Sequence, residues 1–260
     1  MTAVLHDLEA EVRAALAAVV DPELDEPITD LGFVRSVAVA GTGVEVHLRL
    51  PTSFCAPNFA YLMASDALDA VRRVPGVGSA VVELDDHSDS DIINRGLARS
   101  AGYRGTFGHE AEESLDELRA TFFRKAHTAA MERAITGLLR ADGSRTEDDV
   151  PDLVLGDLPP DAPTTEALLR RRATLGLSVT PDAPVLVDDD GTRPTRQGAA
   201  LLLRRARSVR ISVDGNAHFC RGLLQTRYPG AETDQVPRAD GDGADRPLLP
   251  LLVSSKGTRS

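Results

Sequence analysis

Apolar residues change their spacing three times within residues 1–88, and this change constrains the fold more than any other feature of the chain. They recur first at helical spacing, and Asp21-Pro22 predicts the end of that helix because a residue before proline disfavours the α conformation. In 44–50 apolar and polar residues alternate, which is the period of a half-buried strand. The other predicted elements are a strand over 33–39, a helix over 58–74 and a strand over 80–84. This order predicts a small α+β domain with the topology α-β-β-α-β.

The remaining chain predicts a mainly helical α+β accessory region. Helical spacing covers 109–139, 164–176 and 197–207, while 184–192 and 208–216 have the composition of short strands that end in turn residues. Residues 229–247 have the composition of a flexible linker, and the apolar residues 248–253 are suited to dock the tail back on the body. We therefore expect three parts: an N-terminal domain (1–90), a mixed, largely helical accessory domain (91–228), and a flexible linker with the C-terminal tail (229–260).

Composition disfavours several classes of protein. The net charge of −11 and the aromatic content of 4%, with no tryptophan, argue against a nucleic-acid binder. No run approaches the ~18 to 20 apolar residues of a membrane span, and the N-terminus has an acidic amphipathic pattern instead of a basic signal region. We therefore expect a soluble, cytoplasmic protein with no nucleic-acid or membrane partner. The two cysteines are too few for a disulfide scaffold, so each is analysed as a thiol.

Cys55 is the first candidate for chemistry, because it lies in a proline-bounded loop just before a predicted helix. The macrodipole at a helix start favours negative charge, so the thiolate is expected to be stabilised there as a soft-metal ligand or a nucleophile. Thr52 and Ser53 can supply hydroxyl hydrogen bonds to the thiolate or to what it binds. The alternative is an inert cysteine packed under the helix.

Asp21-Pro22-Glu23 is the second candidate. Taken alone it is also an ordinary helix cap with proline at the first helical position. Together with the Cys55 segment, however, it resembles the SufT and PaaD type of metal-sulfur cluster assembly domain. The resemblance lies in the segment VVDPELDEPITDLGFVRSV, the two predicted strands after it, and the segment PTSFCAPNFAYLMASDALDAVRRVPGV. The match covers residues 4–87, about a third of the chain.

This resemblance implies one functional surface and a role. Members of the family help to build or deliver iron-sulfur clusters. The positions that match the family's motifs are Asp21, Pro22, Glu23, Asp30, Leu31, Gly32, Thr52 and Cys55. The family commonly has Gly-Cys-Pro around its cysteine, whereas this chain has Phe54-Cys55-Ala56-Pro57, so the loop at the thiol is expected to differ.

A single cysteine cannot enclose a cluster, since the irons normally need about four protein ligands. A second copy of the chain in a homodimer, a client protein, or the C-terminal region with Cys220 and His218 would have to complete the site. His218 and Cys220 stand at i and i+2, and in an extended conformation they would share one face as iron or zinc ligands. The alternative is a chance pattern in a loop. His87, His109 and His127 are interpreted as surface or capping residues.

The leading hypothesis is therefore a maturation factor for metal centres and not an enzyme. It would hold iron or an iron-sulfur cluster transiently through Cys55, with Asp21, Glu23, Thr52 and Ser53 shaping the site, and pass it to a client metalloenzyme. PaaD-like relatives are associated with multicomponent oxygenases, so the resemblance implies an oxygenase as a possible client, with other iron-sulfur assembly proteins as partners.

Two alternatives stay open at this point. In the first, Cys55 is a catalytic nucleophile that a histidine such as His87 or His218 activates, which would make the protein a thiol-dependent enzyme. In the second, the N-terminal domain only docks, and the C-terminal region binds an apo-enzyme in the manner of a chaperone.

Overall fold

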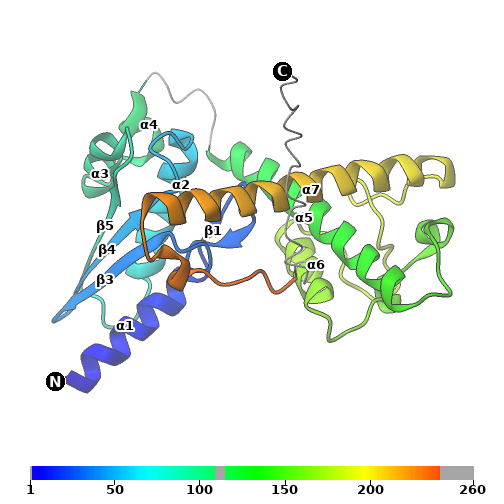
Figure 1. Ribbon diagram of the computed structural model, residues 1–260, viewed down its shortest axis with the longest axis horizontal. Helices are drawn as coiled ribbons and strands as arrows, with labels where there is room; N and C mark the ends of the chain where they lie inside the picture. Colours follow the sequence, from blue (N-terminus) through cyan, green and yellow to red (C-terminus); the bar gives the residue numbers. More distant parts are fainter. Residues whose placement is uncertain (1, 109–114, 241–260) are drawn as a thin grey trace, which may run out of the picture.

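The N-terminal part of the computed structural model is a three-stranded sheet with two helices on one face (Figure 1). The structure describes residues 2–108 and 115–240. The elements are α1 (Thr2–Leu16), β3 (Val34–Ala40), β4 (Gly43–Arg49), α2 (Pro57–Arg72) and β5 (Ser79–Asp85). The strand order is β3-β4-β5, with an antiparallel hairpin followed by a parallel pair across α2. The predicted α+β class and the α-β-β-α-β order are confirmed.

Local sequence explains these elements. In β4 the residues Val44, Val46 and Leu48 are buried and Glu45 is exposed, which is the alternation expected of a strand with one face on a core. Pro57 begins α2, where its missing N–H costs no helical hydrogen bond. The predicted boundaries of both elements agree with the structure to within two residues at either end.

The first helix ends earlier than predicted, at Leu16, and β1 (Val20–Asp21) follows it. β1 pairs in antiparallel fashion with β2 (Glu26–Pro27). The Asp21 carboxylate accepts hydrogen bonds from the backbone N–H groups of Glu23 and Leu24, both at 2.8 Å, and so closes the turn between the two short strands. The apolar spacing up to residue 20 therefore reflects a helix followed by a turn, in which Val19 is buried and Val20 is exposed.

The second half of the chain is mainly helical and has a core of its own. Its elements are α5 (Leu115–Ala141), the 3₁₀ helices η2 (Glu147–Asp152) and η3 (Leu155–Asp157), α6 (Pro163–Thr174), α7 (Arg196–Arg227) and η4 (Ala231–Asp234). α3 (Ser90–Ala98) and α4 (Gly102–Phe107) contact each other, and α3 also packs on β5. Met131, Ile135, Leu168 and Leu203 are among the buried residues of the second core. None of the described helices is both long and apolar enough to cross a membrane.

Two predicted strands are wrong. Residues 208–216 lie inside α7, and residues 184–192 contribute only an isolated bridge between Val154 and Pro184. The β-branched composition of 208–216 is overridden by packing: Ala206, Val213, Ala217 and Leu224 recur at helical spacing and are all buried. A single long helix therefore runs across both halves of the molecule (Figure 1).

The C-terminal end of α7 belongs to the N-terminal core. Ala217, Leu224 and, in η4, Ala231 are buried in the same cluster as the sheet and α1. The backbone N–H of Val236 donates to the Asp30 carbonyl at 2.8 Å. The expectation of a flexible linker from residue 229 is thus corrected for 229–240, which lie against the N-terminal part; residues 241–260 lie outside the described residues.

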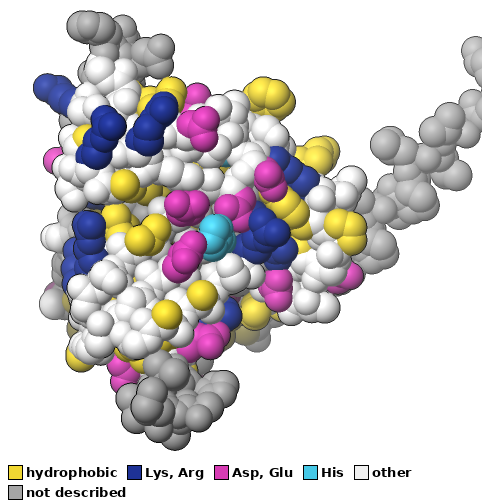
Figure 2. Space-filling model, turned by 90° about the vertical axis from the view of Figure 1, so that its left-hand side faces the viewer, with side chains coloured by type: hydrophobic (Ala, Val, Ile, Leu, Met, Phe, Trp, Pro, Cys, Tyr) yellow, Lys and Arg dark blue, Asp and Glu magenta, His cyan; other side chains and the backbone are white. Residues whose placement is uncertain are grey.

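The outer face of the sheet carries charge. Figure 2 views this side of the molecule, where carboxylates gather around a histidine. His47 Nδ1 lies 2.9 Å from Asp85 and its Nε2 lies 3.0 Å from Glu45, while Arg35 donates to Asp85 at 2.8 Å. The hydrogen bond to Asp85 outweighs the effect of burial and raises the pKa of His47.

Candidate functional site

Asp21 is a buried carboxyl, with 7% of its surface exposed. Burial raises its pKa from 3.8 to about 6, against the backbone hydrogen bonds from Leu24 and Glu23, and the charges of Glu23 and Glu26 raise it further. Near neutral pH a fraction of this carboxyl is therefore protonated, unlike an exposed aspartate.

The Cys55 loop connects β4 to α2. Cys55 is half-buried, and its Sγ lies 3.4 Å from the Thr52 hydroxyl, as the sequence predicts for a hydroxyl partner. The neighbouring Phe54 side chain is 85% exposed. The thiol therefore lies at the boundary between the core and the solvent and is not sealed under α2.

His87 holds this loop through the backbone. It is buried, with 5% of its surface exposed, so a place at the surface is wrong. Its carbonyl accepts the Ser90 N–H at 3.1 Å at the start of α3, which agrees with the other interpretation, a capping residue. Its Nδ1 accepts the Asp89 N–H at 3.1 Å and its Nε2 donates to the Cys55 carbonyl at 2.9 Å. Both ring nitrogens are thus occupied, and neither contacts the Cys55 sulfur. His127, also interpreted as a surface or capping residue, is buried in the interior of α5 with 3% of its surface exposed, so that interpretation is wrong.

Ser53 binds α7 and the start of α3. Its backbone carbonyl accepts the Ser88 N–H at 3.0 Å, and its hydroxyl accepts Arg227 Nη2 at 2.8 Å. Arg227 also donates to the carbonyls of Leu50 and Asp86. These contacts anchor the loop to the C-terminal end of α7, so Ser53 orients the loop and does not point a hydroxyl to the thiol.

Cys220 lies on α7 and is half-buried against the N-terminal core. Burial raises its pKa to about 12, and the charges of Asp21, Cys55 and Glu23 raise it further, while Arg221 lowers it. These charges act on Cys220 because α7 lies over the surface that carries them. Cys55 and Cys220 thus pack against the same apolar core, although more than 160 residues separate the two thiols in sequence.

Further contacts fix α7 on this surface. Asn216 Nδ2 donates to Glu23 Oε1 at 3.1 Å, and Arg221 binds both carboxylate oxygens of Glu26 at 3.0 and 2.6 Å. Gly32 has a φ of +76°, and a side chain there would meet Leu224 and Gln235 at 3.1 to 3.3 Å. The Asp-Leu-Gly motif therefore provides both a turn and a close approach for α7.

His218 does not join the thiols. It lies inside α7, where residues i and i+2 point about 200° apart around the helix axis. The side chain of His218 is exposed, whereas Cys220 faces the core. The predicted extended His-x-Cys pair is thus wrong, because the segment is helical.

The described residues contain no group of three or more histidine, cysteine, aspartate or glutamate side chains arranged to hold a metal ion. The soft-metal ligands that they contain are two free, half-buried thiols, Cys55 and Cys220, and the charges of Asp21 and Glu23 act on Cys220. Sequence reasoning missed Asn216, Arg221 and Arg227, because each acts across more than 170 residues of sequence and leaves no local motif.

Comparisons with known proteins cover the N-terminal third. Residues 9–84 match the family model described as iron-sulfur cluster assembly protein. An iron-sulfur cluster carrier protein of Mycobacterium leprae (strain TN) is 37% identical over 84 residues, which are 32% of this chain and 21% of that protein. An iron-sulfur cluster carrier protein of Mycobacterium tuberculosis (strain ATCC 25618 / H37Rv) is 39% identical over 84 residues, which are 32% of this chain and 22% of that protein. The chain spans about a fifth of the length of these relatives. No solved structure matches it significantly.

Proposed function

From the premise that residues 9–84 form a domain of the iron-sulfur cluster assembly protein family, we propose that this chain is a maturation factor. It receives iron or an iron-sulfur cluster at Cys55 and Cys220 and passes it to a client metalloenzyme. The observation that carries the proposal is that Cys220 of α7 and Cys55 pack against the same apolar core, with α7 bound to Glu23 through Asn216.

The chemistry of the thiol pair suits a transient cargo. Two thiolates are soft ligands, and an iron-sulfur cluster normally needs about four protein ligands, so the remaining positions are open to the client or to a second copy. Burial and negative neighbours hold the proton on Cys220, whose pKa is about 12. A cation must displace this proton to bind, so binding releases a proton, and return of the proton favours release of the cargo.

The acidic residues have separate parts in this proposal. Glu23 is held by Asn216, and Asp21 is held by two backbone N–H groups. These hydrogen bonds fix both carboxylates in place, and their negative charge acts on Cys220. This fixed charge disfavours a bare dithiolate and favours one neutralised by iron.

The test is anaerobic reconstitution with iron and sulfide, read by visible absorption and by bound iron per chain. Cys55→Ser and Cys220→Ser should each lower bound iron by about tenfold or more, because even the loss of a group that only orients a metal ligand lowers metal affinity by that factor. His218→Ala is the matched control on the same helix and should bind as the native chain does, because His218 is exposed on another face.

Two outcomes would contradict the proposal. If neither cysteine variant loses iron, the thiols are not ligands. If only Cys55→Ser loses iron, Cys220 is no ligand, and a second copy or the client completes the site instead. A Cys55→Ser chain that still matures its client fully would favour the alternative of a chaperone-like binding protein.

A multicomponent oxygenase as client is the finer form of this proposal, and it rests on the resemblance of the N-terminal motifs alone. Iron content of such an oxygenase, produced with the native chain and with Cys55→Ser, tests it. The alternative of a thiol-dependent enzyme is less well supported, since His87 is occupied by backbone groups and His218 points elsewhere.

A further inference from the structure

The two most exposed large hydrophobic side chains among the described residues are phenylalanines, and each directly precedes a cysteine. Phe54 is 85% exposed beside Cys55, and Phe219 is 69% exposed beside Cys220. Arg227 ties the Cys55 loop to the C-terminal end of α7, so both phenylalanines belong to the same end of this helix. Large apolar side chains that are exposed together mark interaction sites, whereas singly scattered ones need no explanation. The surroundings of the thiols are therefore a candidate docking surface.

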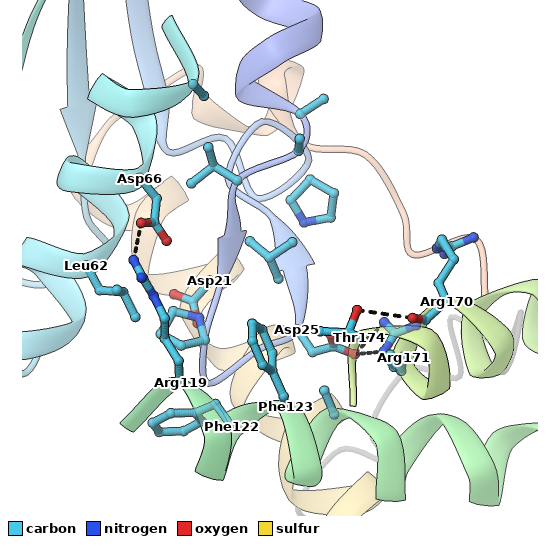
Figure 3. A pocket seen from close by; sticks show the side chains of 18 of the residues that line it. Asp21, Asp25, Leu62, Asp66, Arg119, Phe122, Phe123, Arg170, Arg171 and Thr174 are labelled. Carbon is cyan, nitrogen blue, oxygen red and sulfur yellow. Dashed lines mark hydrogen bonds and ion pairs between the residues drawn. The ribbon is translucent and has the colours of Figure 1, made fainter. Parts of the chain in front are cut away.

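The accessory helices already cover one side of the acidic turn. A cavity of about 870 Å³ lies between the N-terminal part and the helices α5 and α6, and Asp21 lines it (Figure 3). Arg119 of α5 pairs there with Asp66 of α2. Arg171 of α6 pairs with Asp25, with its Nε 2.8 Å from the carboxylate. These ion pairs hold the accessory helices against this side, so a protein partner reaches the thiols over the exposed face of α7.

The exposed face of α7 beside the thiols lacks charge. Five exposed residues recur at helical spacing on one side of this helix. They are Gly215, Phe219, Gly222, Leu223 and Thr226. No exposed residue of the described range 211–226 is charged, although 27% of the chain is. Depletion of charged residues is the compositional mark of the buried centre of an interface.

Two glycines lie on this face without a reason inside the chain. Glycine in the interior of a helix is destabilising relative to alanine. Nothing lies within 4 Å of a Cβ atom built at Gly215 or at Gly222, so the chain itself leaves room for a side chain at both positions. A glycine does allow another chain to approach the backbone closely. The open space over Gly215 is thus suited to receive a side chain from a partner helix.

We propose that the partner is a second copy of this chain, docked with its α7 antiparallel to the first. Gly215 lies four residues before Phe219, and Leu223 lies four residues after it. When a twofold axis at Phe219 relates two such helices, Leu223 of each copy lies over Gly215 of the other. The two phenylalanine rings then meet at the axis. The face is therefore self-complementary, as a symmetric dimer requires.

The charge and the size of the face set the strength of this pairing. Each chain carries a net charge of −11, so two copies repel each other, and an uncharged face is where contact adds least to the repulsion. Residues 211–226 form a strip about 24 Å long on a helix about 10 Å wide, which offers well below the ~800 Å² per partner of a standard interface. We therefore expect a monomer without cargo and a dimer that cargo bound between the copies stabilises.

The antiparallel pair brings the thiols of both copies to one side. Cys220 follows Phe219 and lies about 100° further around the helix. A twofold axis that reverses the helix direction keeps this angle on the same side of the pair, whereas a parallel pair would place the two Cys220 side chains on opposite sides. The Cys55 loop accompanies α7 because Arg227 binds it. Two chains thus offer four thiols, about the number of ligands that an iron-sulfur cluster needs.

Disulfide trapping in the full chain tests the pairing without cargo, after Cys55→Ser and Cys220→Ser have removed the native thiols. One chain then carries Gly215→Cys and another carries Leu223→Cys, both at exposed positions. On mixing under mild oxidation, the disulfide between unlike chains should form several-fold faster than either disulfide between like chains, because only unlike positions come within disulfide reach in the antiparallel pair. Leu201→Cys in place of Leu223→Cys is the matched control and should show no such preference, since Leu201 is 55% exposed on the same helix but lies outside this face.

Sedimentation velocity, with bound iron measured in parallel, tests the four-thiol site, which rests on the proposed function. The native chain should be a monomer before anaerobic reconstitution with iron and sulfide and a dimer after it. Phe219→Asp should stay monomeric and bind several-fold less iron per chain, because two aspartates at the axis repel each other. Leu201→Asp is the matched control and should behave as the native chain does.

The outcomes separate this inference from the proposed function. Disulfides between like chains that form as fast as the unlike one would overturn the antiparallel pairing. An iron-loaded native chain with the mass of a monomer, or a Phe219→Asp chain that dimerises as the native chain does, would overturn the shared site and leave the proposed function intact. A native chain that binds no iron would contradict the proposed function and the four-thiol site with it, while preference for the unlike disulfide would still support the pairing.

Discussion

The two halves of α7 pack on different cores and are held by different chemistry. The N-terminal half places Ala199, Leu203 and Ala206 in the accessory core. Its next turn binds Glu132 of α5, which is fully buried and accepts hydrogen bonds from Arg207 at 3.2 Å and from Arg210. This half is thus fixed to the accessory helices by apolar packing together with a buried ionic cluster.

The C-terminal half packs on the N-terminal part of the chain. Ala217 and Leu224 enter its core, and Arg221 and Arg227 bind Glu26 and the Cys55 loop. It is this half that adds Cys220 to a surface that otherwise has one thiol. One continuous helix thus anchors the accessory region at its N-terminal end and contributes a thiol to the candidate site at its C-terminal end.

The largest expected effect is on the anchored half. Glu132→Gln keeps the shape of the side chain but removes the buried carboxylate, so that Arg207 and Arg210 keep only Glu147 and Asp214 as carboxylate partners. The free energy of unfolding should therefore fall by about 3 kcal/mol, the lower end of the cost of breaking a buried ion pair. Urea denaturation measures it. Glu166→Gln is the control: its pair with Arg170 is exposed and 3.9 Å long, so the change should stay below about 0.5 kcal/mol. Equal losses for the two variants would contradict the buried cluster as the anchor.

The elements of the N-terminal part could be predicted from the sequence because each of them is determined by residues that are close together in the chain. The alternation in β4 and the helical spacing of α2 each depend on neighbouring residues, and the Cys55 loop is defined by the proline that begins α2. The position of Cys220 could not be predicted, because it depends on α7 remaining helical through 208–216. That choice is made by burial of Val213 and Leu224, not by local propensity.

A pair of leucine variants separates the two halves of α7. Leu203 and Leu224 are buried to 2% and 0% exposure in different cores, and replacing either with alanine should cost about 3 kcal/mol. Only Leu224→Ala should also loosen α7 over the thiols. Burial is the main cause of the raised pKa of Cys220, so that pKa should fall and alkylation of Cys220 by iodoacetamide should become faster.

Mass spectrometry of the Cys220 peptide measures this rate separately from that of Cys55. Leu203→Ala serves as the control, since it has the same chemistry and a similar stability loss but a different core. If both variants speed alkylation of Cys220 equally, the two halves of α7 do not move independently, which would contradict their separate anchoring in two cores.

The smallest effect concerns Asp21 and depends on pH. Its pKa is about 6 in the folded chain and 3.8 ordinarily, so between these pH values the folded chain holds a proton that the unfolded chain has released. The stabilisation from this group is therefore complete below about pH 4 and is lost as pH rises through 6, by up to roughly 3 kcal/mol. Asp21→Asn removes the titration while its amide oxygen still accepts the two backbone N–H groups.

Unfolding free energies at pH 4 and pH 7 should therefore diverge between the native chain and Asp21→Asn, with the variant relatively more stable at pH 7. Asp69→Asn, at an exposed site, should follow the native curve.

The pH effect also reports on α7, because burial is the largest cause of the raised pKa of Asp21. Adding Leu224→Ala should admit water to Asp21 and shrink the divergence, whereas Leu203→Ala should leave it unchanged. A divergence that responds equally to both leucine variants would mean that the accessory anchor, and not the C-terminal half of α7, controls the environment of the site.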